Sequence, residues 1–364
     1  MKFTKMIFAA LISALFLSSC TTDPTVEPTP HVSLGTYDSG VLILNQGRWT
    51  YNNSEISFIS LNLNAMENNI FSTVNSPKVL GDIGQDIGFY GDFAYIVMNV
   101  SNKIEIVNRY TMISTGTITG LNNPRYIAFA NGKAYVTNWG VPTVTTDDYI
   151  AIIDLSSNTI TSTIPVIEGP EKIIENAGKL YVAQYGGYGI GSSISVIDIA
   201  TGVTSTIVTG ELPQTMQIDN GFLWVCCQGN QYGSPQTPGY IIKYNLATNQ
   251  MVQTYGFSNA TIHPAHLTVF GSNGYYTIGS GVYKFALNAP ALPTAPVFTS
   301  AAENLYGFAI RNTHIYIGDA TNAFGTNGKV MVYSLGTAGS SGAIGTLEKT
   351  HTVGIGPAGF YFNQ

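Results

Sequence analysis

The chain has 364 residues, of which 45% are hydrophobic and only 10% are charged, and it contains 39 glycines and 22 tyrosines. This hydrophobic content suffices for a large core, and the charged fraction lies far below the usual value of about 25%, which excludes a disordered chain and a long coiled coil. The formal net charge is −6, and residues 1–19 hold two lysines and no acidic residue, so residues 20–364 carry a formal charge of −8. A chain with this negative charge is a poor partner for nucleic acid.

The N-terminus has the features of an export signal. Lys2 and Lys5 precede an apolar run from Met6 to Leu17, which is too short to cross a bilayer comfortably. The four residues that end at Cys20 resemble the lipobox of bacterial lipoproteins, which implies lipidation of that cysteine; the alternative is an ordinary secretory signal with a chance cysteine. We expect a signal peptide at 1–19, lipidation at Cys20 and a flexible tether over 20–39.

A β-hairpin is predicted at residues 124–140. Apolar residues alternate through both arms, and Asn131-Gly132 supplies the positive φ angles of a tight turn. The second arm recurs seven times, at intervals of about 40 to 53 residues that suit four short strands each. These segments begin at Val41, Ala94, Ala134, Leu180, Leu223, Tyr275 and Ile315.

The first arm of the hairpin recurs in step with the second. Its copies begin at Gly84, Pro124, Pro170, Pro213, Pro264, Leu305 and Pro357. Because the last copy lies near the C-terminus and none precedes Val41, we expect it to pair with the N-terminal strands and close a ring without open edges. The prediction is an all-β, seven-bladed β-propeller of four-stranded antiparallel blades over residues 40–364.

The sixth repeat departs from this pattern. Its third strand begins at Val282 after only a glycine-rich turn, and residues 289–296 form a loop interrupted by proline. We therefore expect a short or displaced outer strand in this blade.

Residues Tyr135-Val136-Thr137-Asn138 carry the signature of a known family. On this motif and the repeats over residues 40–364, the chain resembles the YVTN family of seven-bladed β-propellers. The resemblance implies a fold and leaves the function open.

Cys226 and Cys227 are neighbours on a predicted strand, where their side chains point to opposite faces. A disulfide between them would be strained, which favours two small buried side chains over a redox pair.

The residues that open the inner strands are expected to ring one mouth of the central channel. The candidate binding residues among them are Gln85, Asp86, Arg125, Tyr126, Glu171, Gln214, His266 and Tyr306. Two alternatives stay open: His266 as a hydrogen-bonded structural histidine, and Arg125 with Glu171 as a structural salt bridge.

Loops between second and third strands reach the same face and are rich in aromatic residues. Rigid aromatic rings beside amides suit a large, flat or polyhydroxylated ligand, although some rings could simply cap the blades. These candidates are Arg48, Trp49, Tyr51, Trp139, Tyr185, Tyr188, Tyr232 and Phe324.

Sequence motifs for catalysis, phosphate loops and metal sites are absent. Carboxylates near the mouth could hold calcium, but no fixed ligand spacing supports such a site, and we expect neither a metal nor a cofactor. These carboxylates are Asp86, Glu171, Asp147, Asp148 and Asp319.

The asparagine-rich segments around residues 45–53 and 101–109 look like those of propeller lipoproteins of Bacteroidota. Some of those bind cobalamin at the cell surface and pass it to an outer-membrane transporter. The resemblance implies a monomeric, lipid-anchored outer-membrane protein that captures a corrinoid at the cell surface. Exported lipoproteins of this bacterial group commonly carry an acidic cluster just after the lipidated cysteine. Here Asp23 and Glu27 are the only acidic residues between Cys20 and Pro30, so a periplasm-facing location stays open.

Two further functions remain as alternatives. One is a lactonase- or lyase-type enzyme that uses His266, Glu171 and Arg125 with a bound metal, which requires these three side chains to converge. The other is a scaffold that binds a surface protein or a glycan.

Overall fold

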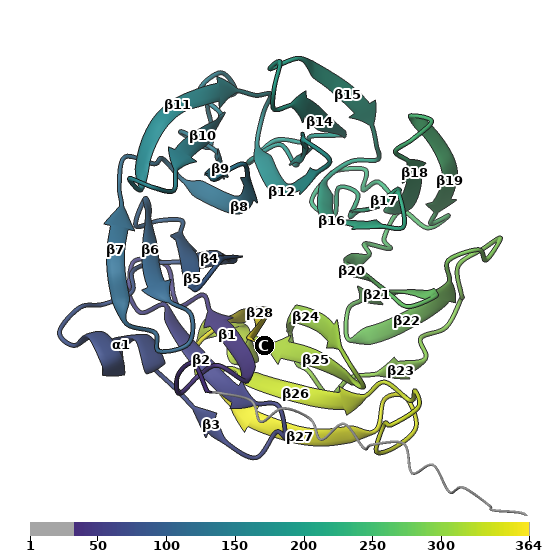
Figure 1. Cartoon of the computed structure of the whole chain (residues 1–364). Helices are drawn as coiled ribbons and strands as arrows, with labels where there is room; N and C mark the ends of the chain where they lie inside the picture. Colours follow the sequence, from purple (N-terminus) through teal and green to yellow (C-terminus); the bar gives the residue numbers. More distant parts are fainter. Residues whose placement is uncertain (1–32, 364) are drawn as a thin grey trace, which may run out of the picture. The chain divides into compact units, whose positions relative to one another are not determined.

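The computed structural model describes residues 33–363, and the chain from Leu34 onward forms one compact unit. In this unit, seven four-stranded antiparallel sheets surround a central axis as blades of a propeller, which confirms the predicted fold (Figure 1). The predicted signal peptide, Cys20 and the tether up to residue 32 lie outside the described residues. Between residues 33 and 363, no helix has both the length and the hydropathy needed to span a membrane.

Each blade runs outward from an inner strand at the channel to an outer strand at the rim (Figure 1). The inner strands of blades 2 to 7 and then blade 1 are β4 (Gly84–Tyr90), β8 (Pro124–Ala130), β12 (Pro170–Asn176), β16 (Pro213–Asp219), β20 (Ala265–Phe270), β24 (Leu305–Arg311) and β28 (Pro357–Asn363). The second strands of blades 1 to 7 are β1 (Gly40–Asn45), β5 (Phe93–Met98), β9 (Lys133–Asn138), β13 (Lys179–Gln184), β17 (Phe222–Cys227), β21 (Asn273–Ile278) and β25 (His314–Asp319).

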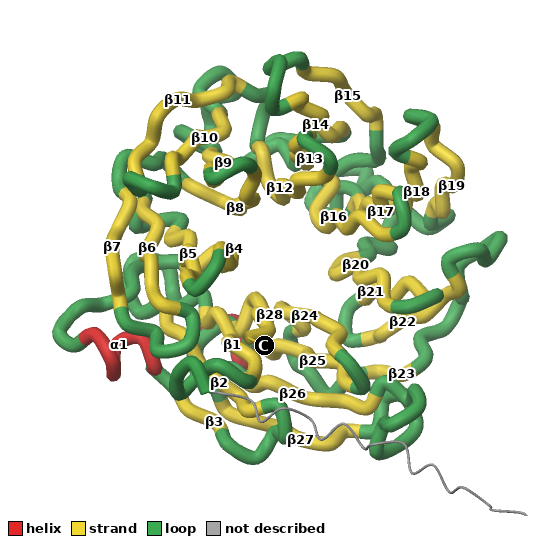
Figure 2. The backbone as a smooth tube through the Cα atoms, in the orientation of Figure 1, coloured by secondary structure: helices red, strands yellow, loops and turns green. Residues whose placement is uncertain are grey.

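The outer half of the blades follows the same order. The third strands are β2 (Glu55–Ser60), β6 (Lys103–Asn108), β10 (Tyr149–Asp154), β14 (Ser193–Asp198), β18 (Tyr240–Asn245), β22 (Gly281–Ala286) and β26 (Lys329–Ser334). The outer strands are β3 (Met66–Glu67), β7 (Ser114–Ile118), β11 (Thr159–Pro165), β15 (Thr204–Val208), β19 (Gln250–Gly256), β23 (Phe298–Thr299) and β27 (Leu347–Thr352). Figure 2 shows the loops that join these strands at both ends of the blades.

Blade 1 closes the ring. Its strand order is β28-β1-β2-β3, so the C-terminal strand pairs with the N-terminal ones as predicted. Asn363 secures this closure, because its side-chain amide donates to the backbone oxygens of Tyr37 and Arg109, both at 2.6 Å. The Arg109 Nε–H in turn donates to the Asn363 side chain. The closed ring leaves no inner strand without a partner.

The core consists of seven apolar clusters, one between each pair of neighbouring blades. Alternate residues of one strand enter different clusters, as the period of two requires. On β1, Leu42 and Leu44 face blade 2, whereas Val41 and Ile43 face blade 7. Radial packing of this kind buries both faces of every blade.

The two adjacent cysteines follow the same alternation. Cys227 enters the cluster between blades 4 and 5, and Cys226 enters the cluster between blades 5 and 6. Both are free and fully buried, and burial raises the pKa of the Cys227 thiol to about 12. The structure therefore confirms two small core residues and not a disulfide.

Blades 1 and 6 depart from the repeat. The outer strand of blade 6, β23, has only 2 residues, which confirms the predicted short strand. In blade 1, β3 is equally short and is followed by a helix that the sequence analysis did not predict, α1 (Ile70–Asn75). Ile70 and Phe71 of this helix fill the core between blades 1 and 2.

The compact unit begins six residues earlier than the predicted domain, at Leu34 and not at residue 40. Tyr37 explains this difference: its ring is 4% exposed and lies against Phe58, at 5.2 Å between ring centroids. The end of the segment predicted as a tether thus belongs to the core.

Candidate ligand-binding site

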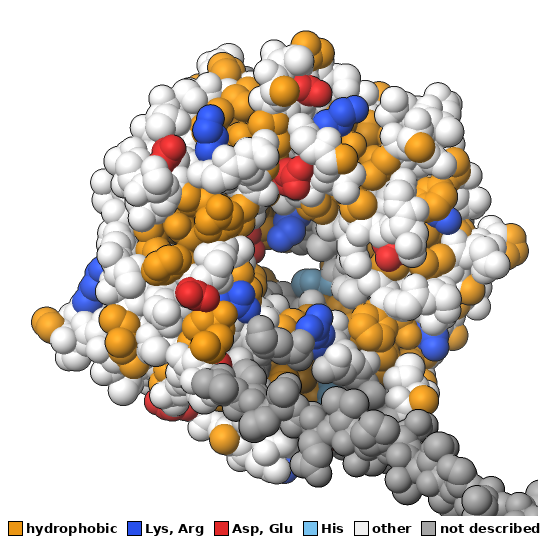
Figure 3. Space-filling view, viewed as in Figure 1, with side chains coloured by type: hydrophobic (Ala, Val, Ile, Leu, Met, Phe, Trp, Pro, Cys, Tyr) orange, Lys and Arg blue, Asp and Glu red, His pale blue; other side chains and the backbone are white. Residues whose placement is uncertain are grey.

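A cavity of about 710 Å³ lies at one mouth of the channel. We call it the mouth cavity. It brings together all eight inner-strand candidates and three of the loop aromatics. These residues are Gln85, Asp86, Arg125, Tyr126, Glu171, Gln214, His266, Tyr306, Trp49, Trp139 and Tyr188. Figure 3 shows the open centre of the ring, with hydrophobic and charged side chains around it.

A repeated backbone irregularity directs these side chains to the mouth. Every pairing of an inner strand with its neighbour shifts register within the first few residues of the inner strand, as between Pro124 and Ile127 in blade 3. Such β-bulges bend a strand end and change the direction of its side chains. The second residue of each copy of the first arm, such as Arg125 after Pro124, is therefore directed away from the blade core.

Arg125 and Glu171 form the strongest polar contact of the mouth cavity. The Arg125 Nε–H and Nη2–H donate to the two Glu171 carboxylate oxygens at 2.8 and 2.7 Å, in a bidentate pair that joins blades 3 and 4. The two side chains are only 15% and 7% exposed. Burial alone lowers the pKa of Arg125, but the Glu171 carboxylate outweighs it and raises this pKa.

Trp139 covers this pair. The Arg125 guanidinium carbon lies 4.1 Å from the centroid of the indole ring, and the Trp139 Nε1–H donates to the Pro170 backbone oxygen at 3.1 Å. A hydrogen-bonded indole over a paired guanidinium is a fixed aromatic surface at the rim.

Asp86 forms a second connected group. Its Oδ1 accepts from the Tyr361 hydroxyl at 3.1 Å, and its Oδ2 accepts from the Ile127 backbone N–H at 3.2 Å. The Lys172 ammonium lies 3.9 Å from Oδ1 and 4.5 Å from the centroid of the Tyr126 ring. Blades 1 to 4 thus contribute to one network in which both carboxylates of the mouth have partners.

Three tyrosines of the mouth cavity remain neutral phenols. Burial raises the pKa of Tyr126, Tyr306 and Tyr361, and nearby carboxylates raise it further. Their hydroxyl groups therefore keep the ability to donate hydrogen bonds at neutral pH. The Tyr306 hydroxyl donates to Gln46 Oε1 across the junction of blades 7 and 1.

The other half of the mouth contains polar groups without partners. Gln214 Oε1 is buried and accepts no hydrogen bond from the described residues. No hydrogen bond joins the His266 ring to another group of residues 33–363, and its centroid lies 6.4 Å from that of the Phe308 ring. The structural and the functional role considered for His266 both stay predictions. Burial lowers the pKa of His266 to about 4.

His266 also has an unusual backbone. Its φ of 55° makes it the only described inner-strand residue in the left-handed region, which costs a residue with a side chain about 1 kcal/mol. The surrounding blade holds this conformation.

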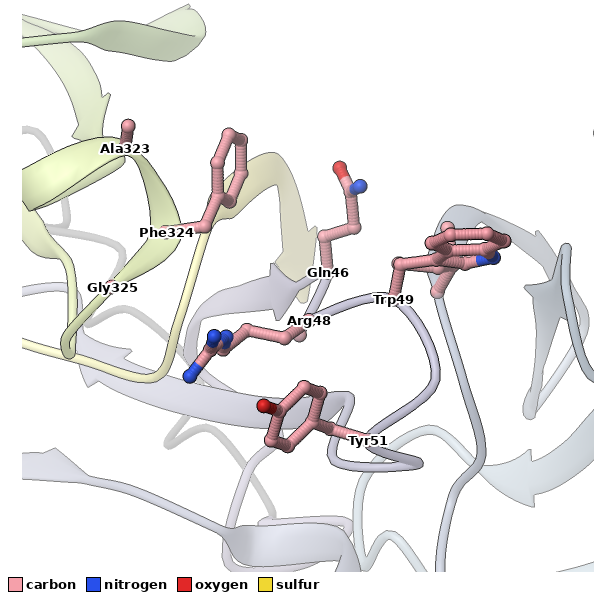
Figure 4. Close-up of a pocket in the computed structure, with 9 residues that line it drawn as sticks. Gln46, Arg48, Trp49, Tyr51, Ala323, Phe324 and Gly325 are labelled. Atoms are coloured by element: carbon pink, nitrogen blue, oxygen red, sulfur yellow. The ribbon is translucent and has the colours of Figure 1, made fainter.

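A second cavity of about 330 Å³ lies beside the mouth cavity. We call it the side pocket. Its walls are the loop after β1 and the segment α2 (Thr321–Phe324) of blade 7, and it shares Gln46, Trp49 and Ile83 with the mouth cavity. Arg48, Tyr51 and Phe324 line it, as Figure 4 shows. The two cavities are therefore direct neighbours.

Tyr185 and Tyr232, the remaining candidates, line neither cavity. The Tyr185 hydroxyl donates to Gln228 Oε1 at 3.3 Å, and burial raises its pKa to about 12. Tyr232 is 87% exposed on its own loop.

The family model described as "Domain of unknown function (DUF5074)" matches residues 39–338. The chain belongs to this family. No curated protein matches it at a significant level.

Solved structures show the same fold at low sequence identity. The periplasmic gluconolactonase PpgL of Pseudomonas aeruginosa is 11% identical with a TM-score of 0.65, over 89% of this chain and 98% of that one. A functionally unknown protein from Desulfotomaculum acetoxidans is 14% identical with a TM-score of 0.62 over the same shares. Kuenenia stuttgartiensis hydrazine synthase is 17% identical with a TM-score of 0.58, over 74% and 86%. These likenesses concern the fold alone.

Several residues of the mouth cavity in this DUF5074 propeller were missed from sequence, among them the hydrogen-bonding residues Gln46 and Tyr361. Tyr361 had only a weak signal. It occupies the inner-strand position that holds Gly88, Ala128 and Ala309 in blades 2, 3 and 7, but Ile174 and Gln217 in blades 4 and 5. Gln46 had no comparable signal.

The carboxylates considered for calcium do not form a metal site. Within residues 33–363, no three His, Cys, Asp or Glu side chains are arranged to hold a metal ion. Asp319 is buried and accepts from the Asn304 backbone N–H at 2.9 Å, and Asp148 accepts from the Gly169 N–H at 3.1 Å.

Proposed function

We propose that this protein binds a large, rigid ligand across the mouth cavity and releases it unchanged, with a corrinoid as the candidate. The observation that carries the proposal is that both carboxylates of the mouth are bound to neighbouring protein groups. The surface left for a ligand consists of aromatic faces, phenol hydroxyls and amides.

Exposed aromatic rings surround this surface. Trp49 is 71% exposed and Tyr188 is 76% exposed, although both line the mouth cavity. Rings of this kind offer a large contact area with little loss of side-chain entropy, and exposed aromatic patches commonly mark binding sites. A corrin ring is broad and fringed with amides, so it complements aromatic faces flanked by Gln85 and Gln214.

The proposed setting follows from the N-terminal sequence. Lipidation at Cys20 would anchor the protein in the outer membrane, and the resemblance to lipoproteins of Bacteroidota favours the cell surface, with an outer-membrane transporter as the recipient of the ligand. Protease treatment of intact cells tests this location, because a surface protein is digested and a periplasm-facing one is protected.

Titration with cobalamin tests the ligand. We expect a change in the visible spectrum of cobalamin and heat of binding by calorimetry. Trp49→Ala should weaken binding by about 10- to 100-fold, since exposed aromatic anchors carry much of an interface's energy. Tyr232→Ala is the control, because Tyr232 is also a largely exposed aromatic residue, at 87% against 71% for Trp49, and lies outside both cavities. Neither a spectral change nor heat with the wild-type protein would refute corrinoid binding.

A lactonase activity is the second candidate. His266 lines the same cavity as Arg125 and Glu171, and its lowered pKa leaves the imidazole unprotonated at neutral pH, as a general base requires. Against it, both Glu171 oxygens are bound to Arg125. Hydrolysis of gluconolactone that His266→Ala and Glu171→Gln leave unaltered would exclude a role for these residues.

A further inference from the structure

We propose that the side pocket is a phosphate-binding subsite in which Arg48 holds a phosphate ester group. The step from this subsite to the whole ligand rests on the proposed function. The side pocket lies next to the mouth cavity and shares Gln46, Trp49 and Ile83 with it. One ligand could then place its broad part over the channel and its phosphate beside Arg48.

The Arg48 guanidinium has no hydrogen-bond or ion-pair partner in residues 33–363. Its hydrogen bonds use the backbone alone: the N–H donates to Asn53 Oδ1 at 2.8 Å, and the carbonyl accepts from the Tyr51 N–H at 3.0 Å. The side chain is only partly exposed, yet all five of its N–H donors are free. A half-buried guanidinium without an acceptor is a site that an anion would complete.

The loop after β1 fixes the position of this cation. The guanidinium carbon lies 4.2 Å from the centroid of the Tyr51 ring, and Figure 4 shows the Arg48 side chain directed away from Trp49 and toward Tyr51. The Thr50 N–H donates to Asp82 Oδ2 at 2.7 Å, and Thr50 itself has a φ of 69°. The hydrogen bonds of the loop hold Arg48 in place before any ligand arrives.

The opposite wall is equally constrained. Asn322, Ala323 and Phe324 are three consecutive residues with positive φ, at 51°, 44° and 68°. The Phe324 ring meets Tyr306 edge to face at 4.8 Å, and Gly356 lies so close that an added Cβ would be 2.8 Å from Phe324. Strained backbone that tertiary contacts maintain is characteristic of ligand clamps.

The donors around the side pocket favour phosphate over a carboxylate. Gln46 Oε1 accepts from Tyr306, the N–H groups of the Gln46 amide have no partner among residues 33–363, and Tyr51 is 58% exposed. Arg48, Gln46 and Tyr51 all line the side pocket and together carry several N–H and O–H donors, which suits the more numerous oxygens of a phosphate ester better than the two of a carboxylate.

Two carboxylates support the walls of the side pocket. Asp82 accepts from Thr50, and Glu303 Oε2 accepts from the Asn322 N–H at 3.4 Å. Neither forms an ion pair with Arg48 in the described part of the chain. They fix the loops and reduce the attraction of Arg48 for an anion, so binding of a small phosphate ester alone is expected to be weak.

Titration of methyl phosphate, followed by broadening of its phosphorus NMR signal, tests the subsite in the absence of any corrinoid. The wild-type protein should broaden the signal, Arg48→Gln should abolish the effect and Arg48→Lys should keep part of it. Lys133→Gln is the control, because it removes the same charge from an exposed hairpin turn of blade 3. Equal broadening by wild type and Arg48→Gln would overturn the proposal, and so would tighter binding of acetate than of methyl phosphate.

Two corrinoids test the link to the proposed function. Cobalamin carries a phosphodiester, whereas cobinamide lacks it, so Arg48→Gln should weaken cobalamin binding by about 10-fold and leave cobinamide binding unchanged. An equal loss for both would overturn the assignment of the side pocket to the phosphate of the ligand. Methyl phosphate binding without any corrinoid binding would support the subsite and refute the corrinoid.

Discussion

Two arginines at the same end of the channel have opposite environments. Arg125 is bound through two hydrogen bonds to Glu171 and covered by Trp139, whereas Arg48 rests on Tyr51 and has no carboxylate partner in the described chain. The first arginine joins two blades. The second lies in a cavity.

A similar difference separates two parts of the mouth. On the side of blades 2 to 4, Asp86, Glu171 and Asp148 all accept hydrogen bonds from neighbouring strands or loops. On the other side, Gln214 Oε1 lacks a partner and His266 has a strained backbone. Paired groups indicate a structural wall, and unpaired groups indicate where ligand contacts are to be sought.

Glu171→Gln tests whether the Arg125–Glu171 pair stabilises the folded protein. Because the variant leaves Arg125 nearly buried without a full counter-charge, it should lower the free energy of unfolding by about 3 kcal/mol. Arg48→Gln should change it by less than about 0.5 kcal/mol, since no protein partner is lost. Urea denaturation measures both values.

The double variant Arg125→Met with Glu171→Leu is the control for Glu171→Gln. It removes both charges and should recover most of the lost stability. A loss below about 1 kcal/mol for Glu171→Gln would mean that the pair behaves like a surface salt bridge and that the two arginines are not distinct.

Asp148 predicts a pH dependence of the free energy of unfolding on the side of blades 2 to 4. Burial raises its pKa from 3.8 to about 6, and Asp147 and Glu168 add to this effect, although the Gly169 N–H lowers the pKa. The folded protein therefore binds more protons than the unfolded chain between pH 4 and 6, and its free energy of unfolding should fall as pH rises through this range. Asp148→Asn should lack this fall, which amounts to at most about 3 kcal/mol. Denaturation at several pH values measures it, and parallel curves for the two proteins would contradict the prediction.

Variants of His266 test the backbone strain in blade 6, where we expect a small difference in stability. Because φ is positive at this position, His266→Gly should be about 1 kcal/mol more stable than His266→Ala, although both lose the same ring. Thermal unfolding of the two variants measures the difference. A more stable alanine variant would show that the chain relaxes at this residue and that the strain is not imposed by blade 6.

The architecture could be predicted because each blade repeats the same local sequence pattern. The copies that begin at Pro124 and Pro357 show both the blade and its closure, and alternation along β17 predicts the separate environments of Cys226 and Cys227. The helix α1 could not be predicted, because it replaces part of an outer strand in only one repeat. Its six residues are short of a clear helical period.

The site was only partly predictable. Residues such as Glu171 and His266 reach the mouth because every inner strand bulges at the same place, which is a property of the repeat. Whether an arginine finds a carboxylate depends on the neighbouring blade and on loop lengths. The sequence offered the Arg125–Glu171 salt bridge as one alternative, but it could not show that Arg48 has no such partner. Tyr232 lies outside both cavities, and the sequence could not show this because the direction of a long loop is not encoded in its composition.

The binding proposed for the mouth cavity depends on closure of the ring by β28. Tyr361 and Ala358 of this strand line the mouth cavity, so the cavity is complete only when the last strand has docked against β1. By linkage, any ligand held there must also oppose detachment of that strand, in proportion to its saturation. A protein in which β28 had detached would therefore lose the proposed ligand binding before the other blades unfolded.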